Sequence, residues 1–539
     1  MGTALGQSSA DTTGTISGQV VSDSGQPLGG ASLFVRAVNS NGAPRNTLAD
    51  AEGNFRLTGL EPALYAISAA APTYASEPVP ATYYRPGDSV RLELVRGGVI
   101  TGTVTNSAGE AVISVRVRAI RIRDANGQAP RSPAFGYREQ STDDRGVYRI
   151  YGLLPGTYLV SAGGGVSFSS MFNPYENDVP TYAPSSMRDN ASEISVRSGE
   201  EIDVDIRYRG EPGHTISGTT KVGGTSGATV TLTTRGSRFA LANTYQPPGG
   251  RGFVFAGLAD GEYTLRAQEI VAEQPPNTPL IRMATKRVTI KGANVTGLEL
   301  ITTPLASISG RVLLEPSKIT ECQGKRAPLF AETLVQLQRP EKEIEDEDGI
   351  YVGLLGGVAS PDASGVLVWR NVMPGRYRFE PRYYARYWYL KSIVINTSGA
   401  KPQKIDAAAS WTSAKSGDQL TGVTITLAEG AASIRGHVQP GSVFYLIPAE
   451  PDKATDVLRF FATDVASDGT FTLNNLPPGK YLALTQANVD AQIATQAKLR
   501  EPESEAATAR VKLRRAAETK KTEIELKPCQ NLADYQLKQ

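Results

Sequence analysis

The sequence predicts an all-β protein built as a tandem array of five antiparallel β-sandwich domains. Three observations lead to this prediction: a short phrase that recurs five times, a turn signal and a tyrosine that follow each copy, and apolar residues that alternate in between. Alternation with a period of two places one face of a strand in a core and the other face in solvent. Short strands with turns at regular intervals, and almost no helical pattern, are typical of β-sandwiches.

The recurring phrase has an isoleucine followed two residues later by a glycine. Its copies are Ile16–Val20, Ile100–Val104, Ile216–Thr220, Ile308–Val312 and Ile434–Val438. Successive glycines lie between 84 and 126 residues apart, close to the usual size of a small domain. A solenoid repeat is shorter and has a fixed period. The spacing therefore favours separately folded modules with loop insertions.

Each module also ends in a recognisable way. A tight-turn signal precedes a short apolar strand, and a Pro/Gly corner then leads to a tyrosine. The corner tyrosines are Tyr65, Tyr158, Tyr263, Tyr377 and Tyr481. Glycine supplies the positive φ that such turns need, and proline presets φ at a corner. We expect closing strands at 90–94, 202–206, 288–290 and 423–427, with the next domain starting almost at once, so the linkers are short and the array is semi-rigid.

These marks together resemble the carboxypeptidase regulatory-like (transthyretin-like or prealbumin-like) domain, most clearly over Ile16–Tyr65 and Ile100–Tyr158. The arrangement is also similar to multi-module proteins of soil bacteria, which carry a corner like Thr82–Gly87 and a later segment like Trp388–Ser392. The resemblance implies Ig/transthyretin-like sandwiches, secretion and no intrinsic catalysis. It does not imply a peptidase, because the name comes from an accessory domain beside a zinc enzyme.

We predict sandwich domains over residues 14–97, 98–211, 212–304, 305–430 and 431–528. They lie between an N-terminal segment, 1–13, and a C-terminal tail, 529–539. Over 501–521 many helix formers compete with the strand that the resemblance implies at 511–513. We expect a short helix or turn there, followed by strands that complete the fifth repeat. The tail packs back on its own chain or adds to the open sheet edge of a neighbour.

Composition agrees with a soluble extracellular protein. Hydrophobic residues make up 40% and charged residues 20% of the 539 residues, which is the globular range. A formal net charge of +2 gives no electrostatic reason to expect nucleic acid as a partner. No apolar run is long enough to span a membrane. The first residues lack a basic segment followed by an apolar one. Either the protein stays inside the cell or its signal has been removed, and from the resemblance we expect the second.

Few residues suit catalysis. The two histidines, His214 and His437, stand in no HxxE, HExxH or CxxC pattern, and no GxSxG elbow occurs. We therefore predict a protein that is not an enzyme, with no catalytic residues, no cofactor and no metal. The acidic run at 341–349 fails the EF-hand spacing, which favours a solvated loop over a calcium site.

Cys322 and Cys529 are the only cysteines. One interpretation is a disulfide that ties the C-terminal tail to the fourth domain, closes a loop of about 200 residues and stabilises the fold by a few kcal/mol. The other interpretation is two unpaired thiols in a reducing compartment.

One aromatic cluster is a candidate binding site. It consists of Tyr383, Tyr384, Tyr387, Trp388 and Tyr389. On a strand, Tyr384 and Trp388 would share one face and the other three tyrosines the opposite face. Flat rings with polar tips stack on sugars or anchor a protein interface. The alternative is a tyrosine-rich sheet face at a domain junction.

Two functions remain open. The first is a secreted or cell-surface scaffold, structural or adhesive, whose partners are copies of itself in an extracellular fibre or other surface proteins. The second is a glycan-binding protein whose partner is a polysaccharide. We favour the first, because repeated modules on short linkers work through surface and reach. This preference rests on analogy between folds.

Overall fold

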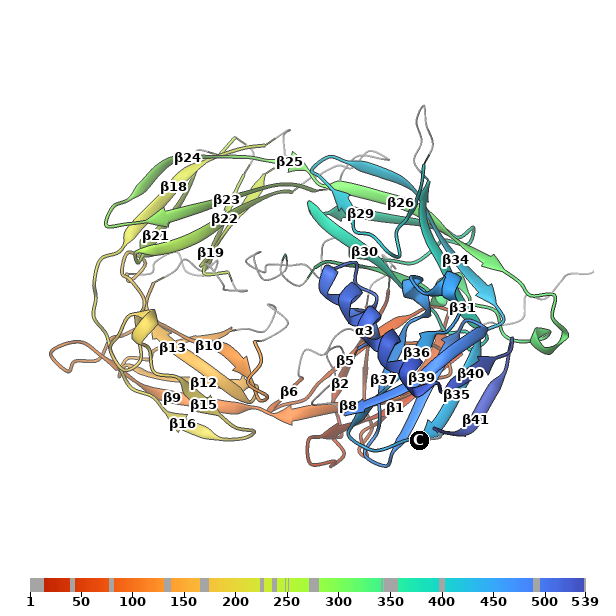
Figure 1. Ribbon diagram of the computed structural model, residues 1–539. Helices are drawn as coiled ribbons and strands as arrows, with labels where there is room; N and C mark the ends of the chain where they lie inside the picture. The colour runs from red at the N-terminus through yellow and green to blue at the C-terminus, as the bar shows by residue number, and fades with distance from the viewer. Residues whose placement is uncertain are drawn as a thin grey trace, which may run out of the picture. The chain divides into compact units, whose positions relative to one another are not determined.

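The structure is a computed structural model that describes residues 14–38, 44–76, 82–129, 137–164, 174–222, 227–234, 240–247, 249–250, 252–270, 281–340, 343, 357–396, 403–487 and 495–537. The chain divides into two compact units, one ending at Leu305 and the other beginning at Ala306. Five stretches of chain each form two sheets that enclose one apolar core, and we number these stretches sandwich 1 to sandwich 5 (Figure 1).

Sandwich 1 packs the sheet β4-β1-β8-β6 against the sheet β3-β2-β5-β7. Its strands are β1 (Gly14–Ser22), β2 (Ser32–Ala37), β3 (Arg45–Leu48), β4 (Asn54–Leu60), β5 (Tyr65–Ala70), β6 (Tyr74–Ala75), β7 (Tyr83–Tyr84) and β8 (Ser89–Arg96). The core takes Ile16 and Val90 from the first sheet and Leu33 and Tyr65 from the second. The alternating residues of the sequence therefore meet between the two sheets, as predicted.

Sandwich 2 packs β12-β9-β16 against β11-β10-β13-β14, with β17 and β15 as short additions to β9 and β13. Its elements are β9 (Gly98–Thr105), β10 (Arg116–Asp124), β11 (Tyr137–Ser141), β12 (Val147–Leu153), β13 (Gly156–Ala162), β14 (Thr181–Tyr182), η2 (Arg188–Asn190), β15 (Ile194–Val196), β16 (Glu201–Asp203) and β17 (Ile206–Arg207). Residues of β9 alternate strictly between buried and half-buried. This is the period of two that the sequence shows.

Sandwich 3 packs β21-β18-β24 against β20-β19-β22-β23-β25. Its strands are β18 (His214–Lys221), β19 (Ala228–Thr234), β20 (Ala242–Gln246), β21 (Phe253–Leu258), β22 (Gly261–Ile270), β23 (Ile281–Ile290), β24 (Val295–Ile301) and β25 (Thr303–Pro304). The prediction that residues 288–290 form the closing strand is wrong. Those residues end β23 in the opposite sheet, and β24 closes the sandwich instead.

Sandwich 4 packs β29-β26-β34-β31-β32 against β28-β27-β30-β33. Its elements are β26 (Ala306–Glu315), η3 (Thr320–Cys322), η4 (Phe330–Glu332), β27 (Leu334–Gln338), β28 (Val358–Ala359), β29 (Val366–Val372), β30 (Gly375–Arg382), β31 (Trp388–Asn396), β32 (Lys404–Asp406), β33 (Thr412–Ala414) and β34 (Gln419–Glu429). Trp369 is buried at its centre, 5.4 Å from the ring of Phe379.

Sandwich 5 packs β38-β35-β41 against β37-β36-β39-β40. Its elements are β35 (Ala432–His437), β36 (Ser442–Pro448), η5 (Pro451–Lys453), η6 (Val457–Arg459), β37 (Phe461–Asp464), β38 (Thr470–Leu476), β39 (Gly479–Ala487), α2 (Gln496–Leu499), α3 (Ser504–Lys520), β40 (Glu523–Leu526) and β41 (Asn531–Gln536). Helix α3 covers the second sheet from outside (Figure 1).

Two expectations for the C-terminal region are wrong. Residues 511–513 lie within the 17-residue helix α3 and not on a strand. Ala506, Ala509, Leu513 and Ala517 recur every three or four residues and pack as one helical face against β36 and β39. The domain boundary at 528 is also wrong, because the C-terminal segment packs back on its own chain, which is the first of the two alternatives: β41 pairs in parallel with β35 and completes the first sheet of sandwich 5.

Within the described parts of the chain, strand pairing is antiparallel except at one recurring place. In every sandwich the opening strand, which carries the repeated phrase, pairs in parallel with the closing strand. The parallel pairs are β1 with β8, β9 with β16 and β17, β18 with β24, β26 with β34, and β35 with β41. The first and last strands of each sandwich are therefore neighbours in one sheet. Linkers are short, as predicted: Gly97 alone separates β8 from β9.

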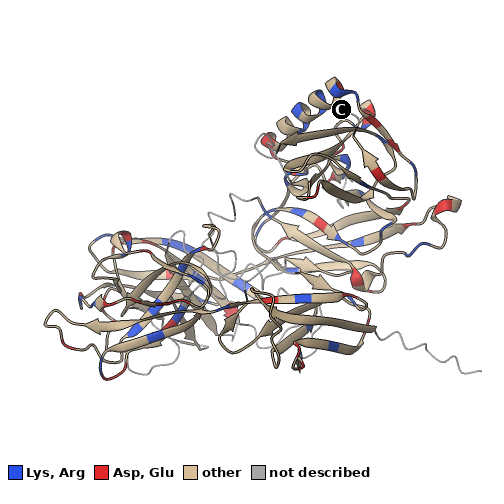
Figure 2. Cartoon of the chain, turned by 90° about the horizontal axis from the view of Figure 1, so that it is seen from below, with Lys and Arg blue, Asp and Glu red and all other residues tan. Residues whose placement is uncertain are grey.

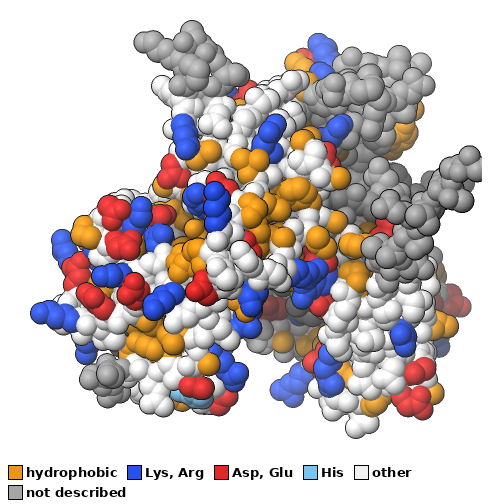
Figure 3. Space-filling model, turned by 90° about the vertical axis from the view of Figure 1, so that its right-hand side faces the viewer, with side chains coloured by type: hydrophobic (Ala, Val, Ile, Leu, Met, Phe, Trp, Pro, Cys, Tyr) orange, Lys and Arg blue, Asp and Glu red, His pale blue; other side chains and the backbone are white. Residues whose placement is uncertain are grey.

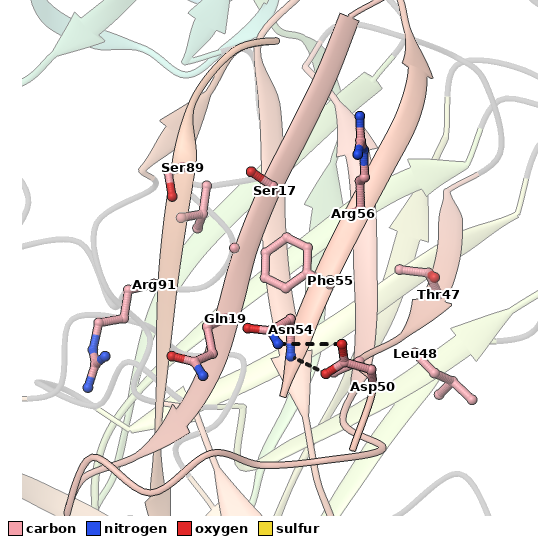
Figure 4. Close-up of a pocket in the computed structure, with 13 residues that line it drawn as sticks. Ser17, Gln19, Thr47, Leu48, Asp50, Asn54, Phe55, Arg56, Ser89 and Arg91 are labelled. Carbon is pink, nitrogen blue, oxygen red and sulfur yellow. Dashed lines mark hydrogen bonds between the residues drawn. The ribbon is translucent and has the colours of Figure 1, made fainter. Parts of the chain in front are cut away.

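The close approach of these two strands explains the repeated glycine. A Cβ atom at Gly18 would lie 2.0 Å from the carbonyl oxygen of Val90 and 2.6 Å from Cζ of Phe55, whose ring lies beside β1 (Figure 4). The corresponding distance to the closing-strand carbonyl is 2.1 Å at Gly102, 2.2 Å at Gly218, 2.3 Å at Gly310 and 2.1 Å at Gly436. No side chain fits at these positions, so the phrase keeps glycine in all five copies.

The corner tyrosines also share one geometry. Each hydroxyl donates a hydrogen bond to the backbone carbonyl four residues upstream, at 3.0 Å for Tyr65, 2.6 Å for Tyr158, 2.7 Å for Tyr263, 2.6 Å for Tyr377 and 2.8 Å for Tyr481. This is the tyrosine corner known from immunoglobulin-like sandwiches. It fixes the Pro/Gly corner to the strand that follows.

Candidate functional site at the junction in the second unit

The tyrosine-rich segment lies where sandwich 4 meets sandwich 5, and we call this contact region the junction. Residues 383–387 form a turn between β30 and β31. The expected alternation of the rings on one strand is therefore wrong for these residues. The turn is closed by a hydrogen bond from the Trp388 backbone N–H to the carbonyl of Ala385.

The five aromatic residues have different surroundings. Trp388 is only 2% exposed and belongs to the core of sandwich 4, so it cannot stack on a sugar from this position. Burial raises the pKa of the Tyr383 hydroxyl, which lies 3.4 Å from the carbonyl oxygen of Trp388. Tyr384, Tyr387 and Tyr389 are half-buried. A glycan contact by this cluster stays a prediction, carried by the tyrosines alone.

Asn475 of sandwich 5 fastens this turn. Its side-chain amide donates to the carbonyl of Ala385 at 2.8 Å and to the carbonyl of Trp388 at 2.7 Å. Asn475 has a φ of 58°, at the bulge where β38 pairs irregularly with β35. The equivalent bulge positions of the first three sandwiches are Gly59, Gly152 and Gly257, also with positive φ. Asparagine tolerates this conformation and supplies a side chain where glycine has none.

Other contacts at the junction involve the start of the closing strand. The Arg386 guanidinium donates to Oδ1 of Asn531 at 2.8 Å and to Oγ of Ser433 at 3.2 Å. The backbone carbonyl of Tyr387 accepts from the N–H groups of Gly430 and Ala431, which link the two sandwiches. These contacts tie both the entry and the last strand of sandwich 5 to sandwich 4.

The two cysteines lie in the same region. The structure joins Cys322 of η3 to Cys529, just before β41, with an S–S distance of 2.02 Å and Cα atoms 5.4 Å apart. Cys322 is fully buried. The bond spans 207 residues of sequence and connects sandwich 4 directly to the closing strand of sandwich 5. This geometry fits the predicted disulfide, and a chemical measurement remains its test.

The apolar core of sandwich 4 also extends across the junction. Val457 and Leu458 of η6 belong to sandwich 5 in sequence but pack in the core of sandwich 4. The indole N–H of Trp411, just before β33, donates to a carboxylate oxygen of Glu503, just before α3, at 3.1 Å. Apolar packing, hydrogen bonds and a covalent bond thus hold one compact unit together.

A polar cavity of about 350 Å³ opens beside these contacts. Its apolar lining comes from Leu390, Leu458, Phe461 and Pro477, and its polar lining includes Tyr384, Asn474, Gln496, Glu380, Arg382 and Arg500. The Arg500 guanidinium lies over the ring of Phe461, with Cζ 5.1 Å from the ring centre, and donates to the carbonyl of Leu458. Burial lowers the pKa of Arg500, against the opposing effect of Glu380.

No catalytic arrangement emerges from the described residues. Within them, no three His, Cys, Asp or Glu side chains come close enough to hold a metal ion. His214 is partly exposed, with Nε2 3.4 Å from the carboxylate of Asp260, and His437 is exposed on β35. The acidic run at 341–349 lies outside the described residues except Glu343. That the protein is not an enzyme stays a prediction.

Comparison with known proteins bears on the first sandwich. Residues 15–95 match the family model of the carboxypeptidase regulatory-like domain. The resemblance predicted from the repeated phrase is therefore confirmed for this segment. The carboxypeptidase regulatory-like segment coincides with sandwich 1, from β1 to β8. No curated protein matches the chain in sequence.

Among the solved structures that are similar in part to this chain are three bacterial proteins. The Bacillus anthracis TIE protein is 16% identical, with 54% of this chain and 50% of that chain covered and a TM-score of 0.15. The minor pilin GBS52 of Streptococcus agalactiae is 12% identical, with 36% and 96% covered and a TM-score of 0.21. Two B repeat units of the collagen binding protein of Staphylococcus aureus are 10% identical, with 77% and 100% covered and a TM-score of 0.13.

The distribution of charged and apolar residues does not indicate a particular partner. Basic and acidic residues are interspersed along the strands and loops, and the face shown in space-filling view also mixes both signs (Figures 2 and 3). Across the described part of the chain, no helix has the length and apolar character needed to cross a membrane.

Sequence reasoning singled out the turn at 383–389 but missed its partners. Asn475, Arg500 and the pair Val457 and Leu458 stand in no motif of the single sequence. The one usable signal was the bulge position, where asparagine replaces the glycine of sandwiches 1 to 3.

Proposed function

We propose that this chain is a non-catalytic, secreted or cell-surface scaffold that transmits tension between attachment points near its ends. The observation that carries the proposal is the parallel pairing of the opening and closing strands in each sandwich. In the proposed setting its partners are copies of itself or other surface proteins.

The direction of the force on a strand pair decides how strongly the pair resists unfolding. In a parallel pair the two strands start side by side. In sandwiches 1 to 3, tension on the chain acts on the start of the opening strand and the end of the closing strand, which lie at opposite ends of the pair. In sandwiches 4 and 5 the same holds only when the Cys322–Cys529 bond is reduced, because that bond otherwise carries the load past β34 and β35. The load therefore runs along the strands and strains all the hydrogen bonds between them together. A pair loaded at one end opens its bonds one after another and yields at lower force.

The junction supports the same proposal. The disulfide and the packing of η6 keep sandwich 5 attached to sandwich 4 when the chain is loaded. Short linkers leave little slack between successive pairs, since Gly97 alone joins β8 to β9.

Single-molecule pulling of sandwich 1 within the full chain tests the proposal. Handles at positions 14 and 97 load the β1–β8 pair along the strands, whereas handles at 24 and 97 load it from one end. We expect the first geometry to unfold at clearly higher force. Equal forces in the two geometries would remove the mechanical basis of the proposal. Absence of the protein from surface and secreted fractions of its native cells would refute the location.

A further inference from the structure

We propose that the cavity at the junction binds an acidic sugar, a hexuronic acid unit of an extracellular polysaccharide. This site is independent of the scaffold function, because a force-carrying chain needs no ligand there. A load measurement and a binding measurement can therefore fail separately.

Charge in the cavity favours an anion. Arg382 and Arg500 both line it, and among the described residues neither forms an ion pair. Among the described residues of the lining, the only acidic side chain is that of Glu380, whose carboxylate lies 3.7 Å from Nη2 of Arg378. Arg378 is itself 5% exposed and donates to the carbonyl of Ala497. The lining thus carries two guanidinium groups against one carboxylate, with Asp456 also attracting Arg500, and this leaves a net positive charge in the cavity. A bound carboxylate would balance it.

The remaining lining favours a sugar over a simple anion. Tyr384, Asn474 and Gln496 supply hydroxyl and amide groups, and Leu390 and Phe461 supply apolar surface. A pyranose ring presents hydroxyls at its edge and CH groups on its faces, so this mixture matches it. A volume of about 350 Å³ is at the lower end of ligand pockets and suits one or two sugar units.

Binding of D-glucuronate and D-galacturonate to the full-length oxidised protein, followed by saturation-transfer NMR and calorimetry, tests the proposal. D-Glucose, D-galactose and acetate serve as comparison ligands. Arg382 is exposed at the rim, so Arg382→Gln should fold normally. Exposed Arg435 lies on β35 and does not line the cavity, and Arg435→Gln is the matched control.

We expect saturable uronate binding that Arg382→Gln weakens about tenfold and Arg382→Lys largely restores, since charge-assisted hydrogen bonds are of this strength. Arg435→Gln should leave the affinity unchanged, and the neutral sugars should bind more weakly. Failure of both uronates to bind, equal binding of neutral sugars, equal binding of acetate, or indifference to Arg382→Gln would each overturn the proposal.

Discussion

Substitution of the repeated glycine tests how the opening strand is fitted into its sheet. In Gly18→Ala the new methyl group would meet the carbonyl oxygen of Val90 at 2.0 Å and the Phe55 ring at 2.6 Å. Strand β8 or β1 must retreat by about 1 Å to restore an acceptable contact. The parallel register between Ser17 and Ser22 on β1 and Ser89 and Leu94 on β8 then loses hydrogen bonds.

The expected cost is about 3 kcal/mol, from about 1–3 kcal/mol for overpacking and about 1 kcal/mol for each hydrogen bond lost. Gly59→Ala is the matched control in the same sandwich. Gly59 has a φ of 66° but no atom within 4 Å of the added methyl group. It should therefore cost only the conformational strain, about 1 kcal/mol.

Hydrogen exchange of the full chain, read by mass spectrometry, measures the difference. Peptides from β1 and β8 should exchange roughly 100-fold faster in Gly18→Ala, because local opening becomes easier by that free energy. Peptides from the other four sandwiches serve as internal references. Unchanged protection of β8, or a cost no larger than that of Gly59→Ala, would refute the close-approach explanation.

Three further predictions concern the corners and the junction. Burial raises the pKa of Tyr263 from 10.0 to about 12, so its contribution to stability should be complete below pH 10 and fade between pH 10 and 12. The absorbance at 295 nm that is lost in Tyr263→Phe should therefore titrate well above pH 10, and a lost component that titrates near pH 10 would contradict this. Tyr377→Phe removes the corner hydrogen bond to Met373 and should destabilise the second unit by about 1 kcal/mol in thermal unfolding, whereas an unchanged midpoint would show that the corner contributes nothing. Asn475→Gly keeps the positive φ but removes two hydrogen bonds to the turn at 383–387. In hydrogen exchange, peptides covering 383–390 should therefore lose protection by about 1–3 kcal/mol, while peptides from β38 keep theirs. Equal loss of protection in both would argue against a role specific to the junction.

The sheets were predictable because their signals are local. Alternation at Val115–Ile120 or in β9 places side chains on two faces whatever the tertiary context. The repeated glycine was also visible, but its reason was not. A glycine in a sequence is usually explained by a turn that needs positive φ. Gly18 is required for another reason, since a strand more than 70 residues later in the chain leaves no room for a side chain. The parallel pairing that creates this contact leaves no mark in periodicity.

The junction was predictable only in outline. The aromatic cluster marked the right segment, yet its burial depends on Asn475 and on η6, which lie far away in sequence. The length of helix α3 could not be predicted, because the resemblance implies a strand at 511–513. In the structure, alanines and a leucine at helical spacing pack on the outer side of a sheet instead. The closing role of β41 needed the pairing with β35, since the tail alone is short and polar.

End-to-end pulling of the whole chain, oxidised and then reduced, tests the scaffold most directly. With the Cys322–Cys529 bond intact, 207 residues cannot contribute to extension, which at about 3.5 Å per residue hides roughly 700 Å. We predict unfolding steps at high force that end short by this length in the oxidised chain and reach full length after reduction. Smooth extension at low force would contradict the proposed scaffold, and the same final length in both states would contradict the disulfide.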